Sequence, residues 1–319
     1  MKVTVMNPDD QTLATQVPGP QPNSKDAFAP SNSAIHTRGL LKDRGRFRLG
    51  PLDIELPTGQ VLGLVGPNGS GKTTLIKLLL GMIASDAGEA AVLGSAPGSL
   101  KEHVCAALDS DYLLPDWTVQ QVCAAVRRFY PRWNQVLAGE LLEQFHIPVK
   151  AKVKELSRGE TSKLKLLLAL APAPELLILD EPTSGLDPLA REEILRVIRE
   201  FMLDESHSVL LSTHIPSDLS TIADSILVLR EGSVAHQGPM DEFTESYFAV
   251  HGANSDLPEI GDQLIGTRRT ASNFTAVVRA DQTAGLPASV VVEQANVDDI
   301  VKALAVTTAQ AAAPQGASK

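Results

Sequence analysis

Short apolar runs alternate with longer helical stretches along much of the chain, and this alternation predicts an α/β fold. Mainly apolar runs, typical of strands buried on both faces of a sheet, lie at 61–65, 176–179, 208–212 and 225–229. Apolar or amphipathic helical stretches lie at 72–82, 161–171 and 191–203. Strands that alternate with helices favour a mainly parallel sheet with helices on both faces.

The pattern changes at three places, which divide the chain into regions. Segments 47–49 and 52–56 alternate apolar and polar residues before a turn, as short antiparallel strands do. Helical stretches at 119–129 and 136–145 predict a helical subdomain, and short strand-like runs with one helix follow residue 254. We therefore predict a disordered tail at 1–33, a main domain at 34–250 with a helical subdomain at about 110–172, and a small α+β accessory region at 251–319 with a flexible end.

A glycine-rich segment, GPNGSGKTT (66–74), follows the strand at 61–65 and opens the next helix. This strand–loop–helix order is that of a phosphate-binding loop, because glycines let the backbone N–H groups wrap a triphosphate. Lys72 supplies a charge for the β- and γ-phosphates, and the Thr73 hydroxyl can hold Mg²⁺. The predicted phosphate-binding residues are Gly66, Pro67, Asn68, Gly69, Ser70, Gly71, Lys72, Thr73 and Thr74.

Two carboxylates end the apolar strand at 176–179. We expect Asp180 to orient Mg²⁺ beside the phosphate loop. Glu181 projects to the other side of the strand, where it can polarise the water that attacks the γ-phosphate. The pair predicts ATP hydrolysis rather than phosphate binding alone.

The composition of the 319 residues narrows the class of protein. An apolar fraction of 43% and a charged fraction of 21% are those of a water-soluble globular protein, and no long uncharged apolar window or secretory leader is present. Cys105 and Cys123 lack metal-ligand spacing, so we expect reduced, structural thiols in the cytosol. A net charge of −10 argues against a nucleic-acid partner.

Three further segments complete a recognisable set of motifs. They are LSRGE (156–160), LLILDEPTSGLD (176–187) and STH (212–214), in that order after the phosphate loop. Over residues 35–245 the chain resembles the ATP-binding subunits of ABC transporters. Within that family the segment FYPRWN (129–134) and the short C-terminal extension are similar to bacterial ABC-2-type exporter ATPases.

The resemblance implies a head-to-tail dimer with ATP, held with Mg²⁺, between two subunits. The signature residues Leu156, Ser157, Arg158, Gly159 and Glu160 would close the partner's site in trans, since a helix N-terminus attracts phosphate. It also implies that His214 contacts the γ-phosphate and supports the attacking water, and that Asp187 links the two subunits. The second subunit would be an identical copy or a close paralogue.

Three positions depart from the family pattern. Asp109 stands where a Mg²⁺-sensing Gln is usual, and it is either a cation ligand or a solvated loop acid. No aromatic residue stands where adenine usually stacks, so Arg44 is the candidate and Phe47 the alternative. Glu160 replaces the usual Gln at the first turn of a helix, where a carboxylate is favourable.

The function predicted from these motifs is an ATP-hydrolysing subunit that drives a membrane permease, most simply an exporter. We expect it to be cytoplasmic and attached to the inner face of the membrane through the permease. Trp133 and Tyr130 either belong to the core of the helical subdomain or line a groove for a permease helix. A soluble ABC-type ATPase without transport, or a nucleotide-dependent regulator, is the alternative function.

Overall fold

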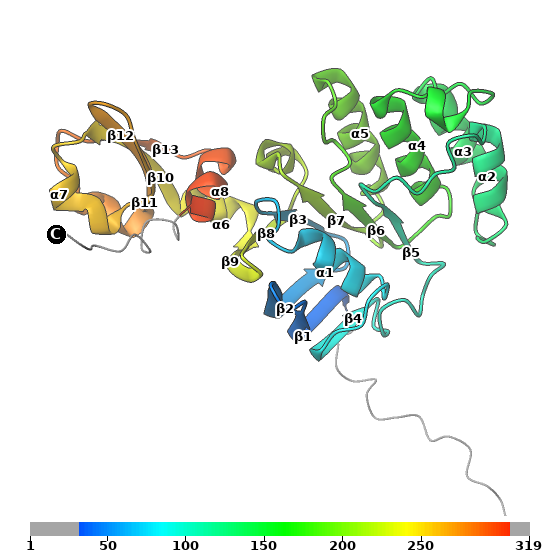
Figure 1. Ribbon diagram of the computed structural model, residues 1–319, viewed down its shortest axis with the longest axis horizontal. Coiled ribbons are helices and arrows are strands. Elements are labelled where there is room, and N and C mark those ends of the chain that lie inside the picture. The colour runs from blue at the N-terminus through cyan, green and yellow to red at the C-terminus, as the bar shows by residue number, and fades with distance from the viewer. Residues whose placement is uncertain (1–31, 307–319) are drawn as a thin grey trace, which may run out of the picture.

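The computed structural model describes residues 32–306, and its centre is a six-stranded sheet (Figure 1). In sheet order the strands are β5 (Val104–Ala107), β6 (Leu176–Asp180), β7 (Ser208–Thr213), β3 (Val61–Val65), β8 (Ser225–Arg230) and β9 (Ser233–Pro239). Neighbouring strands run parallel except β9, which is antiparallel to β8. The predicted α/β fold with a mainly parallel sheet is confirmed.

Both faces of the sheet are buried along its central strands β6, β7, β3 and β8, which explains why these strands read as apolar runs. In β3, Val61 and Val65 pack into one apolar cluster with the helices α4 (Arg158–Leu170) and α5 (Pro188–Phe201). Leu62 and Leu64 point the other way, into a cluster that contains α1 (Lys72–Leu79). Alternate side chains of a strand face opposite sides, so the sheet needs helices on both.

An antiparallel sheet covers the α1 side of the molecule, as predicted for the N-terminal strands. Its order is β2-β1-β4, with β1 (Ser33–Asp43), β2 (Arg48–Pro57) and β4 (Ala87–Val92). The two short strands expected at 47–49 and 52–56 are one strand, β2. Helix α1 ends at Leu79, earlier than the apolar pattern suggested, because Gly81 follows with a positive φ of 66°.

The helical subdomain lies between β5 and β6 along the chain. Its elements are α2 (Val119–Arg127), α3 (Gln135–Gln144), the short η1 (Val153–Glu155) and α4. Thr118 caps the start of helix α2: its hydroxyl accepts from Gln121 N, while the Gln121 side chain accepts from Thr118 N. This reciprocal cap satisfies two N–H groups that a helix start leaves free.

A four-stranded antiparallel sheet, order β11-β12-β10-β13, forms the accessory region at the left of Figure 1. The remaining elements are η2 (Pro216–Thr221), α6 (Met240–Glu245), β10 (Tyr247–Ala253), α7 (Leu257–Ile260), η3 (Gly261–Gln263), β11 (Ile265–Arg269), β12 (Asn273–Arg279), η4 (Ala280–Gly285), β13 (Val291–Gln294) and α8 (Val297–Val306). Helix α8 shares the large apolar cluster of the main domain through Ile300 and Leu304. The Arg230 guanidinium also donates to the Leu304 carbonyl at 2.9 Å.

The division into 1–33, 34–250 and 251–319 stays a prediction. The tail and the flexible end lie outside the described residues, apart from the start of β1 at Ser33. The accessory sheet begins with β10 at Tyr247, shortly before the predicted boundary. Within residues 32–306, no helix has the length and apolar character needed to cross a bilayer.

Candidate active site

The phosphate loop (residues 66–73) leaves the carboxyl end of β3 and enters α1 at Lys72. Two of its glycines lie where a side chain would not fit. A Cβ on Gly66 would lie 2.2 Å from the Leu229 carbonyl oxygen, and one on Gly71, whose φ is +112°, would lie 2.6 Å from Leu49 Cδ1. The backbone contact at Gly66 and the positive φ of Gly71 require glycine, as the loop motif predicts.

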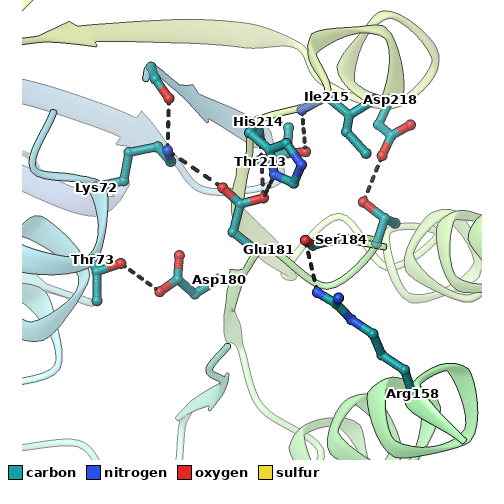
Figure 2. A network of polar contacts seen from close by, with 12 residues as sticks. Lys72, Thr73, Arg158, Asp180, Glu181, Ser184, Thr213, His214, Ile215 and Asp218 are labelled. Atoms are coloured by element: carbon teal, nitrogen blue, oxygen red, sulfur yellow. Dashed lines mark hydrogen bonds and ion pairs between the residues drawn. The ribbon is translucent and has the colours of Figure 1, made fainter. Parts of the chain in front are cut away.

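Lys72 points back over this loop rather than out to solvent. Its side chain is buried, and its ammonium donates to the Gly66 carbonyl oxygen at 2.8 Å. The same Nζ lies 3.5 Å from Glu181 Oε1 (Figure 2). The ammonium is therefore held in place by the Gly66 carbonyl oxygen and the Glu181 carboxylate.

Asp180 and Glu181 lie at the end of β6 and face opposite ways. Asp180 Oδ2 accepts from the Thr73 hydroxyl at 3.0 Å, on the α1 side. Glu181, with a φ of +54°, turns toward Lys72 and His214 (Figure 2). Because β3, β6 and β7 pair in register, Val65 beside Thr213 and Asp180 beside Ser212, their ends bring these groups together.

His214 follows β7 and binds the same carboxylate twice. Its backbone N–H donates to Glu181 Oε2 at 3.0 Å, and its ring Nδ1 contacts that oxygen too. The side chain of Glu181 is 12% exposed, whereas that of His214 is 48% exposed. The histidine therefore fixes the carboxylate and keeps one edge of its ring open to a ligand.

The oxygen atoms around Asp180 fit a hard divalent cation such as Mg²⁺. Asp180 is 3% exposed, and burial raises the pKa of its carboxyl group. Its Oδ1 atom is buried and makes no hydrogen bond of good geometry with the described residues, although the neighbouring Ser212 hydroxyl also interacts with this carboxylate. A buried carboxylate beside the Thr73 and Ser212 hydroxyls offers the oxygen donors that Mg²⁺ prefers.

The signature segment (residues 156–160) leads into the start of α4 in the helical subdomain. Ser157 caps the helix by accepting from Glu160 N at 3.2 Å, while Glu160 Oε2 accepts from Ser157 N at 2.8 Å. These bonds lower the pKa of Glu160. Ser157 and Arg158 are exposed, and Leu156 and Gly159 are half-buried.

Arg158 joins this segment to the loop that follows Glu181. Its guanidinium donates to Ser184 Oγ at 3.1 Å (Figure 2). It also lies against Gly185, where a Cβ would come within 2.5 Å of it. Asp187 ends the loop and caps α5, accepting from Leu189 N and Ala190 N at 3.0 Å each. The sequence pattern did not predict the Arg158 contact.

Asp109 and Arg44 lie at the edges of the site, and both are exposed. Asp109 follows β5, which pairs with β6, and its charge contributes to raising the pKa of Asp180. Arg44 lies in a turn in which Arg44 N donates to Phe47 O at 2.8 Å. Phe47 borders the phosphate loop, since its Cζ would be 3.0 Å from a Cβ on Gly71.

Comparisons with known proteins identify the family of this chain. A family model described as ABC transporter matches residues 49–184. The Nod factor export ATP-binding protein I of Rhizobium sp. (strain N33) is 33% identical over 227 residues, which cover 68% of this chain and 74% of that protein.

The chain belongs to the ABC transporter family. The ABC transporter ATP-binding protein YtrB of Bacillus subtilis (strain 168) is 29% identical over 222 residues, covering 69% of this chain and 73% of that protein. This ABC chain is an ATP-binding subunit and an ATPase, as its motifs predicted.

Solved structures of ABC subunits share its fold. An ATP-binding subunit of an ABC transporter superposes with a TM-score of 0.60 at 24% identity, covering 66% of this chain and 91% of that chain. A nucleotide-free ATP-binding cassette gives a TM-score of 0.56 at 22% identity, covering 65% and 91%.

The sequence analysis missed a buried pair, Thr183 and Asp218, which joins the segment after Glu181 to the segment after His214. The Thr183 hydroxyl donates to Asp218 Oδ2 at 2.7 Å, and Arg191 lies 3.6 Å from the other carboxylate oxygen. Burial raises the pKa of Asp218. The available signal was an acidic residue shortly after the STH motif, but its partners come from distant parts of the chain.

Proposed function

We propose that this ABC subunit binds ATP with Mg²⁺ at the phosphate loop, hydrolyses it within a dimer and thereby drives an exporter permease. One observation carries the proposal: Glu181 contacts both Lys72 and His214. A carboxylate fixed between a phosphate-binding cation and a histidine is placed to act on water at a terminal phosphate.

Phosphate binding is assigned to the residues from Gly66 to Thr74. Backbone N–H groups of the loop and the start of α1 would hold the β- and γ-phosphates, with Lys72 as the point charge. Thr73 and Asp180 would hold Mg²⁺, and Asp109 is the third candidate ligand. The cation supplies neutralisation of charge on the phosphate oxygens. Phe47 or Arg44 would stack on the adenine, and Phe47 lies nearer the loop.

Hydrolysis then depends on Glu181 and His214. Glu181 would accept the proton of the attacking water, as the partly buried carboxylate nearest to Lys72. His214 holds that carboxylate through its backbone N–H and ring, and its exposed edge would donate to the γ-phosphate. Transition-state charge is stabilised by Lys72.

The dimer would place the signature segment of one subunit over the phosphate loop of the other. In support, Ser157 is exposed at the N-terminus of a 13-residue helix, where the dipole favours an anion. ATP would join the two surfaces, and hydrolysis would release them. Asp187 would lie near the subunit boundary.

An apolar hollow in the helical subdomain supports permease binding. We call it the docking groove. It has a volume of about 440 Å³ and is lined by Ala106, Tyr112, Leu113, Leu114, Trp117, Val122, Ala125, Val126, Phe129, Tyr130 and Leu168. Phe129 is 78% exposed and Leu114 is 52% exposed. Exposed apolar surface around a hollow is typical of protein-binding sites, and here it would receive a cytoplasmic helix of the permease.

The names of the relatives support a role in export, and binding to a permease would determine where the subunit lies in the cell. Several relatives with 33–35% identity are named as Nod factor export proteins, which favours export. Attachment to the permease would place the subunit at the cytoplasmic face of the membrane. No nucleic-acid partner is expected for an acidic chain.

Light scattering with the Glu181→Gln variant tests the proposed motor. The variant should form an ATP-dependent dimer that persists because hydrolysis is blocked, and the parent protein should dimerise only transiently. A Glu181→Gln, Ser157→Asp double variant is the control, and it should stay monomeric. A monomer in the single variant at saturating ATP would contradict the dimer mechanism. Failure to co-purify with any membrane permease would contradict the transport role alone.

A further inference from the structure

Lys165 lies in the middle of α4 with its side chain turned inward. The residue is 9% exposed, although lysine normally keeps its charge in water. Its ammonium donates to the Leu108 carbonyl oxygen at 3.2 Å and to the Ser110 carbonyl oxygen at 2.9 Å. The Tyr112 ring lies 5.2 Å from the same atom. A buried ammonium is tolerated only with such partners.

The two carbonyl groups flank Asp109 in the sequence. Lys165 therefore fixes the main chain immediately before and after that residue. The segment continues from β5, whose Ala107 pairs with Leu179 of β6, so Asp109 follows one strand while Asp180 ends its neighbour. The ammonium also faces the acidic side chains of this segment, Asp111 first and Asp109 second.

We propose that Lys165 is a positioning residue that holds Asp109 beside Asp180 and thereby ties the cation site to the signature helix. This inference rests on the proposed role of Asp109 as a cation ligand. Helix α4 has Ser157 as its N-terminal cap and Lys165 in its middle. The Lys165 hydrogen bonds therefore connect the signature segment, which would close the ATP site of the partner subunit, to residues 108–110, which would bind the cation of this subunit's own ATP site.

The first test is hydrogen exchange in the full chain without added nucleotide or metal. Lys165→Met removes the ammonium and keeps the apolar stem, so the backbone amides of residues 108–112 should exchange about tenfold faster or more. Lys165→Arg keeps two donors and should restore slow exchange. The matched control is Lys163→Met on the same helix, because Lys163 pairs with Glu193 instead. Unchanged exchange in Lys165→Met would overturn the proposal.

The second test is the Mg²⁺ concentration that gives half-maximal ATP hydrolysis at saturating ATP. Lys165→Met should raise it about tenfold, as loss of a well-placed ligand does. Asp109→Asn should raise it similarly, and the double variant should be no worse than Asp109→Asn. Equal effects of Lys165→Met with and without Asp109 would overturn the proposal.

One outcome separates this inference from the proposed function. If Asp109→Asn leaves the Mg²⁺ midpoint unchanged, Asp109 is not a ligand and this inference loses its cation part, whereas Mg²⁺ binding by Thr73 and Asp180 and hydrolysis through Glu181 still stand. The exchange rates then decide whether Lys165 holds the segment at all. If Lys165→Met does not fold, Lys165→Gln replaces it in both measurements, with thermal unfolding recorded for each variant.

Discussion

The backbone N–H of His214 donates to Glu181 Oε2 at 3.0 Å, and the histidine ring contacts the same oxygen. One residue thus holds the carboxylate by two groups, of which only the ring can be removed by substitution. This division makes the role of the ring testable separately from the position of the strand ends.

His214→Ala should lower the ATP hydrolysis rate at saturating ATP by about a hundredfold or more, because Glu181 and the γ-phosphate lose the ring. ATP affinity should stay close to that of the parent, since Lys72 and the loop remain. His207→Ala is the control, as that ring stacks on Phe201 away from the site. Steady-state kinetics and a binding titration check both statements. An unchanged rate would contradict a hydrolytic role for His214.

Lys72→Ala should weaken ATP binding about ten- to a hundredfold, because a charge-assisted contact with phosphate is lost. Lys77→Ala removes a lysine from the last turn of the same helix and should bind ATP like the parent. Isothermal titration calorimetry measures both affinities. Equal affinity in the two variants would show that Lys72 does not bind phosphate.

Ser157→Asp separates helix capping from dimerisation. Aspartate caps helices as well as serine does, so the variant should fold with a similar midpoint of thermal unfolding. The new carboxylate would oppose the γ-phosphate of the partner's ATP, and ATP-dependent dimerisation should be lost. Ser157→Ala should instead cost about 1 kcal/mol of stability from the lost cap. A Ser157→Asp protein that still dimerises with ATP would place the contact elsewhere.

Phe129→Asp should weaken binding to the permease about tenfold or more, because it puts a charge into the docking groove. Phe129 is 78% exposed, so the fold should tolerate the change. Leu203→Asp alters an equally exposed apolar residue outside the groove and serves as the control. Co-purification with the permease measures the effect, and equal recovery of both variants would exclude the groove.

Glu160 predicts a pH effect on stability. Hydrogen bonds from Ser157 lower its pKa below the ordinary value of 4.5, so the ionised form stabilises the folded state. That contribution is fully present above pH 4.5 and is lost as the pH falls through the lower, folded-state pKa. The difference in unfolding free energy between the parent and Glu160→Gln should therefore be constant from pH 7 to 5 and shrink below it. Urea unfolding across this range measures it, and a pH-independent difference would contradict the assignment.

The strands whose carboxyl ends form the site could be predicted from the sequence. Runs such as 61–65 and 176–179 are apolar throughout because both faces of the sheet are covered, and parallel strands end at one edge. The loop glycines, Lys72, Thr73, Asp180, Glu181 and His214 could be found because each motif is short and continuous.

Other features were hidden because they depend on packing between distant segments. Strand β1 has irregular pairing at several points, which breaks the alternation that would reveal it, and β13 is exposed along its length. The contacts of Arg158 with Ser184 and of Lys165 with Ser110 join residues 26 and 55 positions apart. No local spacing encodes such pairs.

Helix α8 packs on η2, which begins two residues after His214, and the Leu304 carbonyl is bonded to Arg230. Through α8, the accessory region therefore contacts the segment that follows the histidine. A force applied to α8 would reach the segment next to His214, and through it Glu181, by way of packed residues.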